Sequence, residues 1–322
     1  MRVIEAFEFT GYSGLRLVER ENLAPSRDLV TVRLTAAGVN PLDRTILSGG
    51  HPRAKPPVVF GNEGAGVVTH SGPSSLPVGA RVMSAAPFGN GSWQEYVQIK
   101  AEELRPIPDG VDDVTATAAV VGYLSAYLTL QQAGFAAGKS VLAPAIGGAV
   151  GNATYQLAKA LGASKVVSTA GSKAKAEQAR ERGYDNVVDL SAESLAQGVR
   201  RLTDGAGIDV VIDAIGGTIT SEALKAMAMG GSLVTLGYSA GRNTTIDVTD
   251  IIWKDLSVTG FSLFRSTRQE IQAAWDVISP LLVKGTVKPS VARIFPLEEA
   301  AKALQYLIEE RPFGKVILKI AD

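Results

Sequence analysis

Three glycines fall within the seven residues 145–151 (AIGGAVG), between a β-branched run and a helical one. Glycine has no Cβ, so it lets a charged group approach the backbone, and the N-terminus of a following helix supplies unpaired N–H groups and a positive dipole. The spacing A-x-x-G-x-x-G, formed by Ala145, Gly148 and Gly151, is a variant of the dinucleotide-binding fingerprint. An ordinary tight turn is the alternative. The residues expected to contact a pyrophosphate are Gly147, Gly148, Ala149 and Val150.

The elements around this turn favour one of the two interpretations. From about residue 140, apolar strands alternate with amphipathic helices, which is typical of a doubly wound parallel sheet. We expect strands over 140–143, 166–169, 186–190, 209–216 and 232–237, and helices near 152–161, over 173–182, from Ser191, and near 221–228. The first strand-to-helix turn of such a sheet binds a dinucleotide pyrophosphate. The position of the glycines therefore favours a cofactor site.

The rest of the chain has a different texture. Residues 1 to about 120 contain short β-branched or alternating runs separated by Gly and Pro, which predicts a mixed-sheet domain. From about residue 266 we expect a helix, a strand (VARIFPL), a second helix (EEAAKALQYLIEE) and a final strand (GKVILKI), which return to the first domain. The prediction is an α/β protein with one domain over 1–121 and 267–322 and another over 122–266.

Composition excludes several classes of function. Lys and Arg number 32, as do Asp and Glu, so charge gives no reason to expect nucleic acid as a partner. We see no basic-then-apolar leader and no apolar run near the roughly 20 residues of a membrane helix, so no membrane association is expected. Cysteine is absent, and the only histidines are His51 and His70. These counts predict a cytoplasmic protein without disulfides or thiolate metal sites.

A second motif, Tyr155 and Lys159 in Y-x-x-x-K spacing, competes for a catalytic role. Short-chain dehydrogenases use such a pair as a proton donor and the cation that lowers its pKa, but on a later helix beside the nicotinamide. Here the pair falls on the first helix after the glycines. We therefore expect Tyr155 to pack in the core and Lys159 to face solvent.

Six segments together resemble the medium-chain dehydrogenase/reductase superfamily, in its zinc-independent quinone oxidoreductase branch. They are AAGVNPLDRTILSG (36–49), FGNEGAGVV (60–68), GSWQEYVQI (91–99), VVGYLSAYLTL (120–130), DAIGG (213–217) and VTLGYSAG (234–241). The resemblance covers essentially the full length. It implies a β-rich GroES-like catalytic domain and a Rossmann doubly wound parallel-sheet nucleotide-binding domain. The residues that it places near the nicotinamide are Leu236, Gly237, Tyr238, Phe261 and Leu263.

The same segments bear on a metal. Zinc alcohol dehydrogenases carry Cys where this chain has Asn40 and His where it has Asn62, and their cysteine-rich structural lobe has no counterpart here. Catalytic zinc needs three good protein ligands. Glu63 remains, but a lone carboxylate is more often a structural hydrogen-bond acceptor. We therefore expect no metal.

Without a metal the protein cannot readily polarise an isolated carbonyl, so the expected hydride acceptor is a quinone or an α,β-unsaturated carbonyl. The resemblance implies that Asn40 contacts the nicotinamide ribose or the acceptor oxygen; a turn residue before Pro41 is the alternative. Asp43 is expected to fix that loop. Relatives carry Tyr where this sequence has Thr45. Because that phenol is missing, solvent ranks ahead of Tyr123 as the proton source.

The expected cofactor is NADPH. NAD enzymes place an acidic residue at the tip of the second strand, and the run 166–175 (VVSTAGSKAK) has none. Ser172, Lys173 and Lys175 offer a hydroxyl and two cations to a 2′-phosphate. The resemblance assigns this phosphate to Gly171 and Lys175, although the family's supporting Tyr is Leu190 here. A solvated helix start is the alternative.

Two hydroxyls complete the expected cofactor contacts. Thr169 ends the expected second strand, VVST (166–169). Ser125 stands at the family's Thr position, where a hydroxyl can bond the carboxamide or act in catalysis. The alternative for Ser125 is a structural serine near a helix end.

Other functions stay open. An enoyl-thioester reductase would need a basic patch, which Arg44, Arg53 and Lys55 can supply. A non-catalytic NADPH-binding sensor or structural protein is a third possibility. By analogy with the branch we also expect a homodimer, formed through the uncharged β-rich run 257–263 (SVTGFSL) as an exposed edge.

Overall fold

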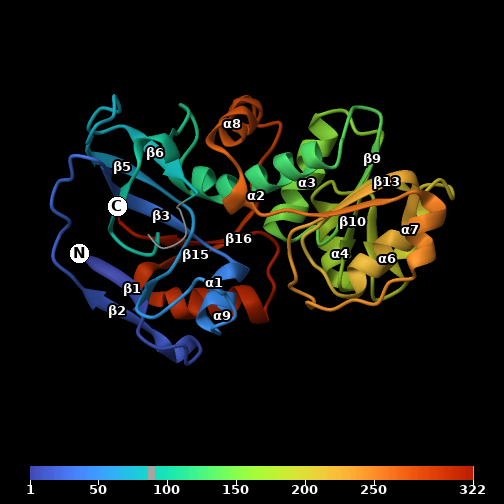
Figure 1. Ribbon diagram of the computed structural model, residues 1–322, viewed down its shortest axis with the longest axis horizontal. Helices are drawn as coiled ribbons and strands as arrows, with labels where there is room; N and C mark the ends of the chain where they lie inside the picture. The colour runs from blue at the N-terminus through green and yellow to red at the C-terminus, as the bar shows by residue number, and fades with distance from the viewer. Residues whose placement is uncertain (86–90, 322) are drawn as a thin grey trace. The chain divides into compact units, whose positions relative to one another are not determined.

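The computed structural model describes residues 1–85 and 91–321, and the chain divides into two units. Unit 1 comprises Met1–Val121 and Pro289–Asp322, and unit 2 comprises Gly122–Lys288. The first division falls inside α2 (Asp113–Gln132), the long helix drawn in green in Figure 1. We expected the second division after residue 266. It lies after Lys288 instead, so α8 (Arg268–Val283) belongs to unit 2.

Gln156 gives a physical reason for this later division. Its Oε1 accepts a hydrogen bond from the backbone N–H of Lys288 at 2.7 Å, and its Nε2 donates to the carbonyl of the same residue at 3.0 Å. Gln156 belongs to α3 (Ala149–Ala160). Both backbone groups of Lys288 are thus paired within unit 2, which holds the segment that follows α8 to this unit.

Unit 2 is built on a six-stranded sheet in the order β11-β10-β9-β12-β13-β14, and every neighbouring pair in it is parallel. The order corresponds to 3-2-1-4-5-6 in a doubly wound nucleotide-binding sheet. The strands are β9 (Ser140–Ala143), β10 (Lys165–Ala170), β11 (Val187–Asp189), β12 (Ile208–Asp213), β13 (Met227–Thr235) and β14 (Ser257–Gly260). The helices are α3, α4 (Lys173–Glu181), α5 (Leu195–Leu202), α6 (Thr218–Ala226), α7 (Val248–Lys254) and α8. The predicted fold class is confirmed.

The starts of three helices in unit 2 differ from the prediction, and one of them is α6, which begins at Thr218 and not near Ser221. α3 begins at Ala149, directly after the glycine turn, and not near Asn152. α5 is capped by Ser194, because the Ser194 hydroxyl accepts from the N–H of Gln197 and the Gln197 side chain accepts from the Ser194 N–H. Ser191, the expected cap, instead donates its hydroxyl to Asp189 at the end of β11 at 2.5 Å.

Unit 1 contains a three-stranded sheet, β2-β1-β4, and a larger sheet in the order β15-β16-β3-β5-β6-β8, with β7 also paired to β3. The strands are β1 (Arg2–Ala6), β2 (Leu15–Glu19), β3 (Val30–Val39), β4 (Val58–Val59), β5 (Gly64–His70), β6 (Arg81–Ser84), β7 (Tyr96–Ile99), β8 (Arg105–Pro106), β15 (Val291–Pro296) and β16 (Lys315–Lys319). The helices α1 (Pro41–Leu47) and α9 (Ala300–Glu309) lie next to each other (Figure 1). Single turns of 3₁₀ helix lie over Tyr12–Gly14, Ala101–Glu103 and Leu297–Glu299 in unit 1, and one more, Leu263–Arg265, lies in unit 2. The C-terminal strands therefore return to the first domain, as predicted.

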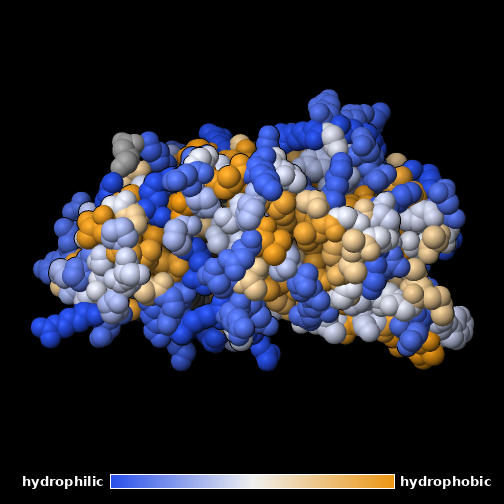
Figure 2. All heavy atoms as spheres, turned by 90° about the horizontal axis from the view of Figure 1, so that it is seen from above, coloured by the Kyte–Doolittle hydropathy of each residue, from blue (hydrophilic) through white to orange (hydrophobic). Residues whose placement is uncertain are grey.

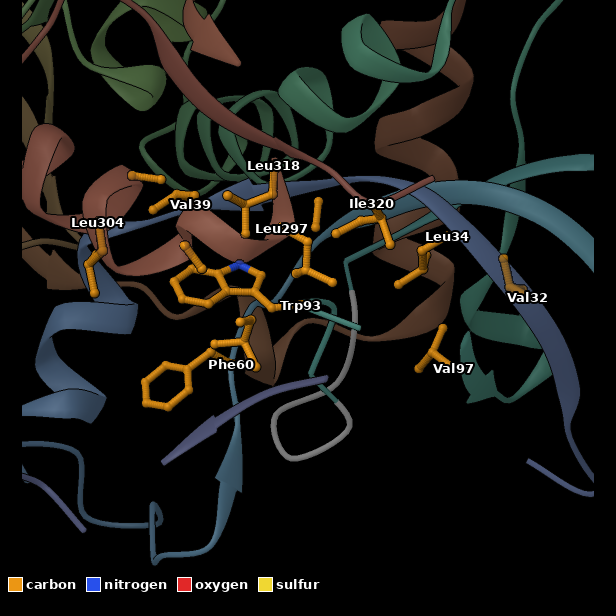
Figure 3. Close-up of a cluster of buried hydrophobic side chains, with 14 of the residues drawn as sticks. Val32, Leu34, Val39, Phe60, Trp93, Val97, Leu297, Leu304, Leu318 and Ile320 are labelled. Atoms are coloured by element: carbon orange, nitrogen blue, oxygen red, sulfur yellow. The ribbon is translucent and has the colours of Figure 1, made fainter. Parts of the chain in front are cut away.

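The core of unit 1 gathers around Trp93. Figure 3 shows its ring beside Phe60, with Val39 and Leu318 nearby; the ring centroids of Trp93 and Phe60 lie 5.6 Å apart. The indole N–H donates to the carbonyl of Gly38 at 3.0 Å, so this large side chain is buried without an unpaired donor. The contact also fixes the end of β3, from which the candidate site begins.

The helix α2 is 20 residues long. α2 is long and apolar enough to cross a membrane by length and composition alone, contrary to our expectation that no run approaches this limit. However, 72% of its most apolar window is buried within the protein, as in the core helix of a folded domain.

Figure 2 shows hydrophobic areas, in orange, between hydrophilic ones on one face of the molecule. Large exposed apolar side chains of unit 2 include Met229, Val248, Ile252, Trp253 and Val258.

Candidate active site

The candidate site in unit 1 lies where β16, β3 and β5 run side by side. Antiparallel pairing of β16 with β3 places Val316 opposite Val39, so the next position on each strand brings Lys315 opposite Asn40. The ammonium Nζ of Lys315 donates to Oδ1 of Asn40 at 2.5 Å. Lys315 is only 4% exposed and Asn40 only 7%. A buried lysine charge is costly unless it is paired, so its partners define the site.

Glu63 is the charge partner of Lys315. Its side chain is fully buried, and its Oε1 forms an ion pair with the Lys315 ammonium and accepts from Nδ2 of Asn40 at 2.9 Å. Its Oε2 accepts from the backbone N–H of Val121 in α2 at 2.9 Å. A Cβ at Gly38 would overlap this carboxylate, so glycine is needed there. Glu63 is thus an acceptor, as expected, but an ion-paired one.

These contacts use most of the bonding capacity of Asn40. Nδ2 of Asn40 donates both to Glu63 and to Oδ1 of Asn62, the latter at 2.6 Å. An amide nitrogen has two donor hydrogens and an amide oxygen two lone pairs. Both donors of Asn40 are therefore occupied, and only one lone pair of its Oδ1 remains. The side chain can accept a hydrogen bond from a ribose hydroxyl, but in this arrangement it has no donor for an acceptor oxyanion.

Asp43 fixes the loop that carries both asparagines. Its Oδ2 accepts from the backbone N–H of Asn40 at 2.7 Å, and its Oδ1 accepts from the N–H of Gly61 at 3.1 Å. The carboxyl is completely buried, and this burial raises its pKa to about 7; the two N–H donors and the charge of Lys315 act in the opposite direction. These contacts agree with the predicted role of Asp43 in holding the loop.

The other predicted catalytic residues are Thr45 and Ser125. Thr45 is half-buried on α1, and its hydroxyl donates to the carbonyl of Pro41 at 3.4 Å. Ser125 belongs to unit 2, where it is buried in the interior of α2 and not near a helix end. Tyr123 is also buried, and this burial raises the pKa of its hydroxyl well above the usual value, so it holds its proton firmly. Tyr123 is therefore a poor acid, which favours solvent as the proton source.

The glycine turn in unit 2 joins the end of β9 to the start of α3. Gly148 is the N-cap of α3, so Ala149 and Val150 open the helix and present its unpaired N–H groups. A Cβ at Gly151 would overlap the carbonyl oxygens of Pro144 and Ala145. Glycine at this position therefore permits close packing of α3 against the turn that follows β9. A pyrophosphate fits such a helix start because its N–H groups and dipole attract anions.

Thr169 holds the turn from the neighbouring strand. Its hydroxyl oxygen accepts from the N–H of Ala145 at 2.9 Å, and its carbonyl accepts from the N–H of Ile146 at 2.9 Å. These bonds maintain Ala145 at a φ of 61°, which residues other than glycine rarely adopt. Asn152 adds a bond from Nδ2 to the carbonyl of Ile146 at 3.2 Å. Thr169 thus shapes the turn, and Asn152 is a second such residue that the sequence analysis missed.

The predicted 2′-phosphate residues follow β10. Ser172 is the N-cap of α4 and accepts from the N–H of Lys175. Lys173 is highly exposed and lies 3.8 Å from Glu177. A Cβ at Gly171 would meet nothing within 4 Å, so the space beside it is open. The group therefore combines open space, a hydroxyl and two lysines at one helix start, as a phosphate site requires.

The residues predicted near the nicotinamide follow the carboxyl ends of the strands in unit 2, where doubly wound sheets bind ligands. The N–H of Leu236 donates to the carbonyl of Asp213 at the end of β12, and the N–H of Phe261 donates to the carbonyl of Thr235 at the end of β13, both at 2.9 Å. Tyr238 is 45% exposed, and Arg242 stacks on its ring. Gly237 and Leu263 are the remaining members of this predicted set.

No group of three or more His, Cys, Asp or Glu side chains suited to a metal ion occurs among residues 1–85 and 91–321. At the positions compared with zinc alcohol dehydrogenases, Asn40 and Asn62 bond each other and Glu63 bonds an ammonium. The oxygen of Asn40 and the carboxylate of Glu63 thus already have a cationic partner.

Comparison with known proteins places the chain in a family. Residues 26–109 match the alcohol dehydrogenase GroES-like domain, and residues 149–280 match the family described as zinc-binding dehydrogenase. The quinone oxidoreductase of Rattus norvegicus is 31% identical over 99% of this chain and 97% of its own length. This chain belongs to the medium-chain dehydrogenase/reductase superfamily, in its quinone oxidoreductase branch.

Two further relatives describe the breadth of this branch. The 2-haloacrylate reductase of a Burkholderia species is 33% identical over 92% of this chain and 92% of its own length. The crystal structure of Escherichia coli quinone oxidoreductase complexed with NADPH has a TM-score of 0.91 and 28% identity, and covers 99% of this chain and 100% of that one. The resemblance that the sequence motifs indicated is therefore confirmed over the full length.

Lys315 was not predicted from the sequence, and no role of its own was predicted for Asn62. Lys315 opens the apolar run KVILKI, and a lysine whose neighbours are all core residues is the signal that could have marked it. Asn62 was considered only as the position of an absent histidine. Tyr155 and Lys159 behave as predicted: Tyr155 is buried against Tyr184 in an edge-to-face contact with ring centroids 5.1 Å apart, and Lys159 is exposed.

Proposed function

We propose that this chain is an NADPH-dependent oxidoreductase that transfers hydride, without a metal, to a quinone or an α,β-unsaturated carbonyl. The observation that carries the proposal is the buried Lys315 ammonium, which bonds both Asn40 and Glu63. A divalent cation bound to the same oxygens would have to displace or repel this ammonium. With two amides and one ion-paired carboxylate in place of good zinc ligands, the site has no Lewis acid to polarise an isolated carbonyl.

The cofactor assignment rests on unit 2. The start of α3 at Ala149 and Val150 would hold the pyrophosphate, and Gly171, Ser172 and Lys175 would hold the 2′-phosphate. The Escherichia coli relative was crystallised with NADPH, which supports the same choice here. When bound, NADPH supplies a hydride; a proton from solvent then completes the two-electron reduction of the acceptor.

The acceptor class follows from what the site lacks. A conjugated carbonyl is already electrophilic at carbon, so it needs orientation and a hydrogen bond to its oxygen more than it needs a metal. Two relatives are named for such acceptors, a quinone oxidoreductase and a 2-haloacrylate reductase. We further propose that the protein acts in the reducing cytoplasm, which the absence of cysteine favours.

One panel of steady-state assays tests this function. NADPH oxidation is measured with 1,4-benzoquinone, a simple enone and crotonyl-CoA, each with and without a chelator. We expect turnover with the quinone or the enone, and no effect of the chelator on activity or stability. Tightly bound stoichiometric zinc in the purified protein, or activity that the chelator abolishes, would overturn the metal-free proposal.

The panel also separates the alternatives. Preference for crotonyl-CoA would indicate an enoyl-thioester reductase, and NADPH binding without turnover of any acceptor would indicate a sensor or structural protein. Of the residues that could form the basic patch for a thioester substrate, Arg44 has its guanidinium 5.6 Å from the centroid of the Tyr12 ring. Arg53 and Lys55 are both exposed, so they favour neither alternative over the proposed function.

A further inference from the structure

The orientation of the Asn62 amide follows from two charges that it does not touch directly. An ammonium can only donate hydrogen bonds, and an ionised carboxylate can only accept them. Oδ1 of Asn40 must therefore face Lys315, and its Nδ2 must face Glu63, as observed. Because the same Nδ2 also lies 2.6 Å from Asn62, the facing atom of Asn62 must be its oxygen. The positions of the two charges thus determine which terminal atom of each amide is the oxygen and which is the nitrogen. This assignment is usually ambiguous for Asn and Gln side chains.

This order leaves the donors of Asn62 unused. Its Nδ2 makes no hydrogen bond to the part of the chain that the structure describes, and it is absent from the fully buried side-chain atoms that lack a partner there. Asn62 retains 7% exposure, so this nitrogen keeps some access to its surroundings. A nearly buried amide with two unused N–H donors is unfavourable unless a water or a ligand pairs with them.

We propose that Asn62 donates this hydrogen bond to the carbonyl oxygen of the hydride acceptor, and that Lys315 and Glu63 are positioning residues that hold it in place through Asn40. The inference rests on the proposed function and names the residue that binds the acceptor. As hydride adds to a conjugated carbonyl, negative charge gathers on its oxygen. A neutral donor that is already oriented stabilises this charge without reorganising.

The geometry also assigns different roles to the two asparagines. Asn40 donates its two N–H groups to Asn62 and Glu63. It therefore orients the Asn62 side chain, and only a lone pair of its Oδ1 remains for a ligand. Asn62 accepts from Asn40 and has its donors available. Asp43 holds the backbone of both asparagines in place. One of its oxygens accepts from the N–H of Asn40, and the other accepts from the N–H of Gly61, the residue before Asn62.

Two substitutions at Asn62 separate a catalytic from a structural role. Asn62→Ala removes the donors and the oxygen that Asn40 uses, and we expect kcat/KM to fall about tenfold to hundredfold with unchanged NADPH affinity. Asn62→Asp keeps an oxygen for Asn40 but, when ionised, has no donor. We therefore expect Asn62→Asp to be less active than Asn62→Ala at high pH. Its activity should recover as the pH falls, because a protonated carboxyl can donate again.

A merely structural Asn62 gives the opposite result. In that case Asn62→Asp, which preserves the bond from Asn40, retains most of the activity and follows the pH profile of the unmodified protein. Asn22→Ala serves as the matched control, because it removes an exposed amide from the same unit and should change nothing. Unfolding curves for each variant show whether lost activity reflects lost fold.

Lys315→Met tests the positioning role. It leaves Asn62 intact but removes the charge that orients Asn40, so we expect kcat to fall while the KM for NADPH stays the same; an unchanged kcat would overturn this part. If Lys315→Met does not fold, the Asn62 pair still decides the main proposal. If the unmodified protein reduces neither quinone nor enone, the proposed function fails. If it is active and both Asn62 variants are unimpaired, the inference alone fails.

Discussion

The buried ammonium of Lys315 donates to Oδ1 of Asn40 at 2.5 Å, although 275 positions separate the two residues in the chain. The contact exists because β16 returns to unit 1 and pairs with β3 in the register that sets Val316 opposite Val39. Lys315 and Glu63 together place a buried positive and a buried negative charge on either side of one amide. Each buried charge thus has a partner of opposite sign.

Lys315→Met should destabilise the protein by about 3–5 kcal/mol, because it leaves the Glu63 carboxylate buried without its cation. The double variant Lys315→Met with Glu63→Gln should recover part of this loss, since no uncompensated charge then remains. Urea unfolding of the two single variants and the double variant measures the coupling. Strictly additive losses would show that the two side chains do not act as a pair.

The stability should also report the protonation of Asp43. Burial raises the pKa of this carboxyl from 3.8 to about 7, so the folded state holds its proton more tightly than the unfolded state does. The contribution of Asp43 to the free energy of unfolding is therefore fully present below about pH 4 and is lost as the pH rises through 7. Unfolding of the unmodified protein and of Asp43→Asn, compared between about pH 4 and 8, should show this fall only in the former. A pH-independent difference would contradict it.

Lys175 should set the preference for NADPH over NADH. We expect a moderate preference, on the order of tenfold to a hundredfold in kcat/KM, which shrinks as ionic strength rises because salt screens exposed charges. Lys175→Ala should weaken NADPH and spare NADH. Lys159→Ala, which removes an exposed lysine near the end of α3, is the matched control. Equal use of both cofactors at low salt would mean that the 2′-phosphate binds elsewhere.

The edge of the unit 2 sheet should form a homodimer. β14 is the last strand in the sheet order and pairs only with β13 within the described chain, and each of its four residues is exposed. Unpaired edge strands invite pairing with a second chain, and Ile252 and Trp253 on the preceding helix α7 are also exposed. Light scattering at micromolar concentration should give the dimer mass, and Val258→Lys should shift it towards the monomer. A monomeric unmodified protein would reject the proposal.

Much of unit 2 could be predicted from local sequence. The alternation of apolar strands with amphipathic helices and the glycine spacing are local patterns, and strands such as Ser140–Ala143 appear at the predicted residues. Helix starts were less accurate, because Ser191 and Ser194 are equally good caps by type. Only the capping box between Ser194 and Gln197 decides between them.

The site in unit 1 shows where prediction from sequence ends. Residue type and motif were enough to identify Asn40, Asp43 and Glu63. A resemblance to a family indicates such positions, but it does not show which atoms their side chains contact. That Asn40 has no donor left depends on Lys315, and no local pattern relates residue 315 to residue 40. The amino-acid sequence by itself thus determined the fold class and the position of the glycine turn, which follow from short-range periodicity and spacing, and its motifs indicated the family by resemblance. Only the tertiary structure decided which amide is free to bind, because strand pairing over a long distance brought a buried cation to one asparagine and left the donors of the other unused.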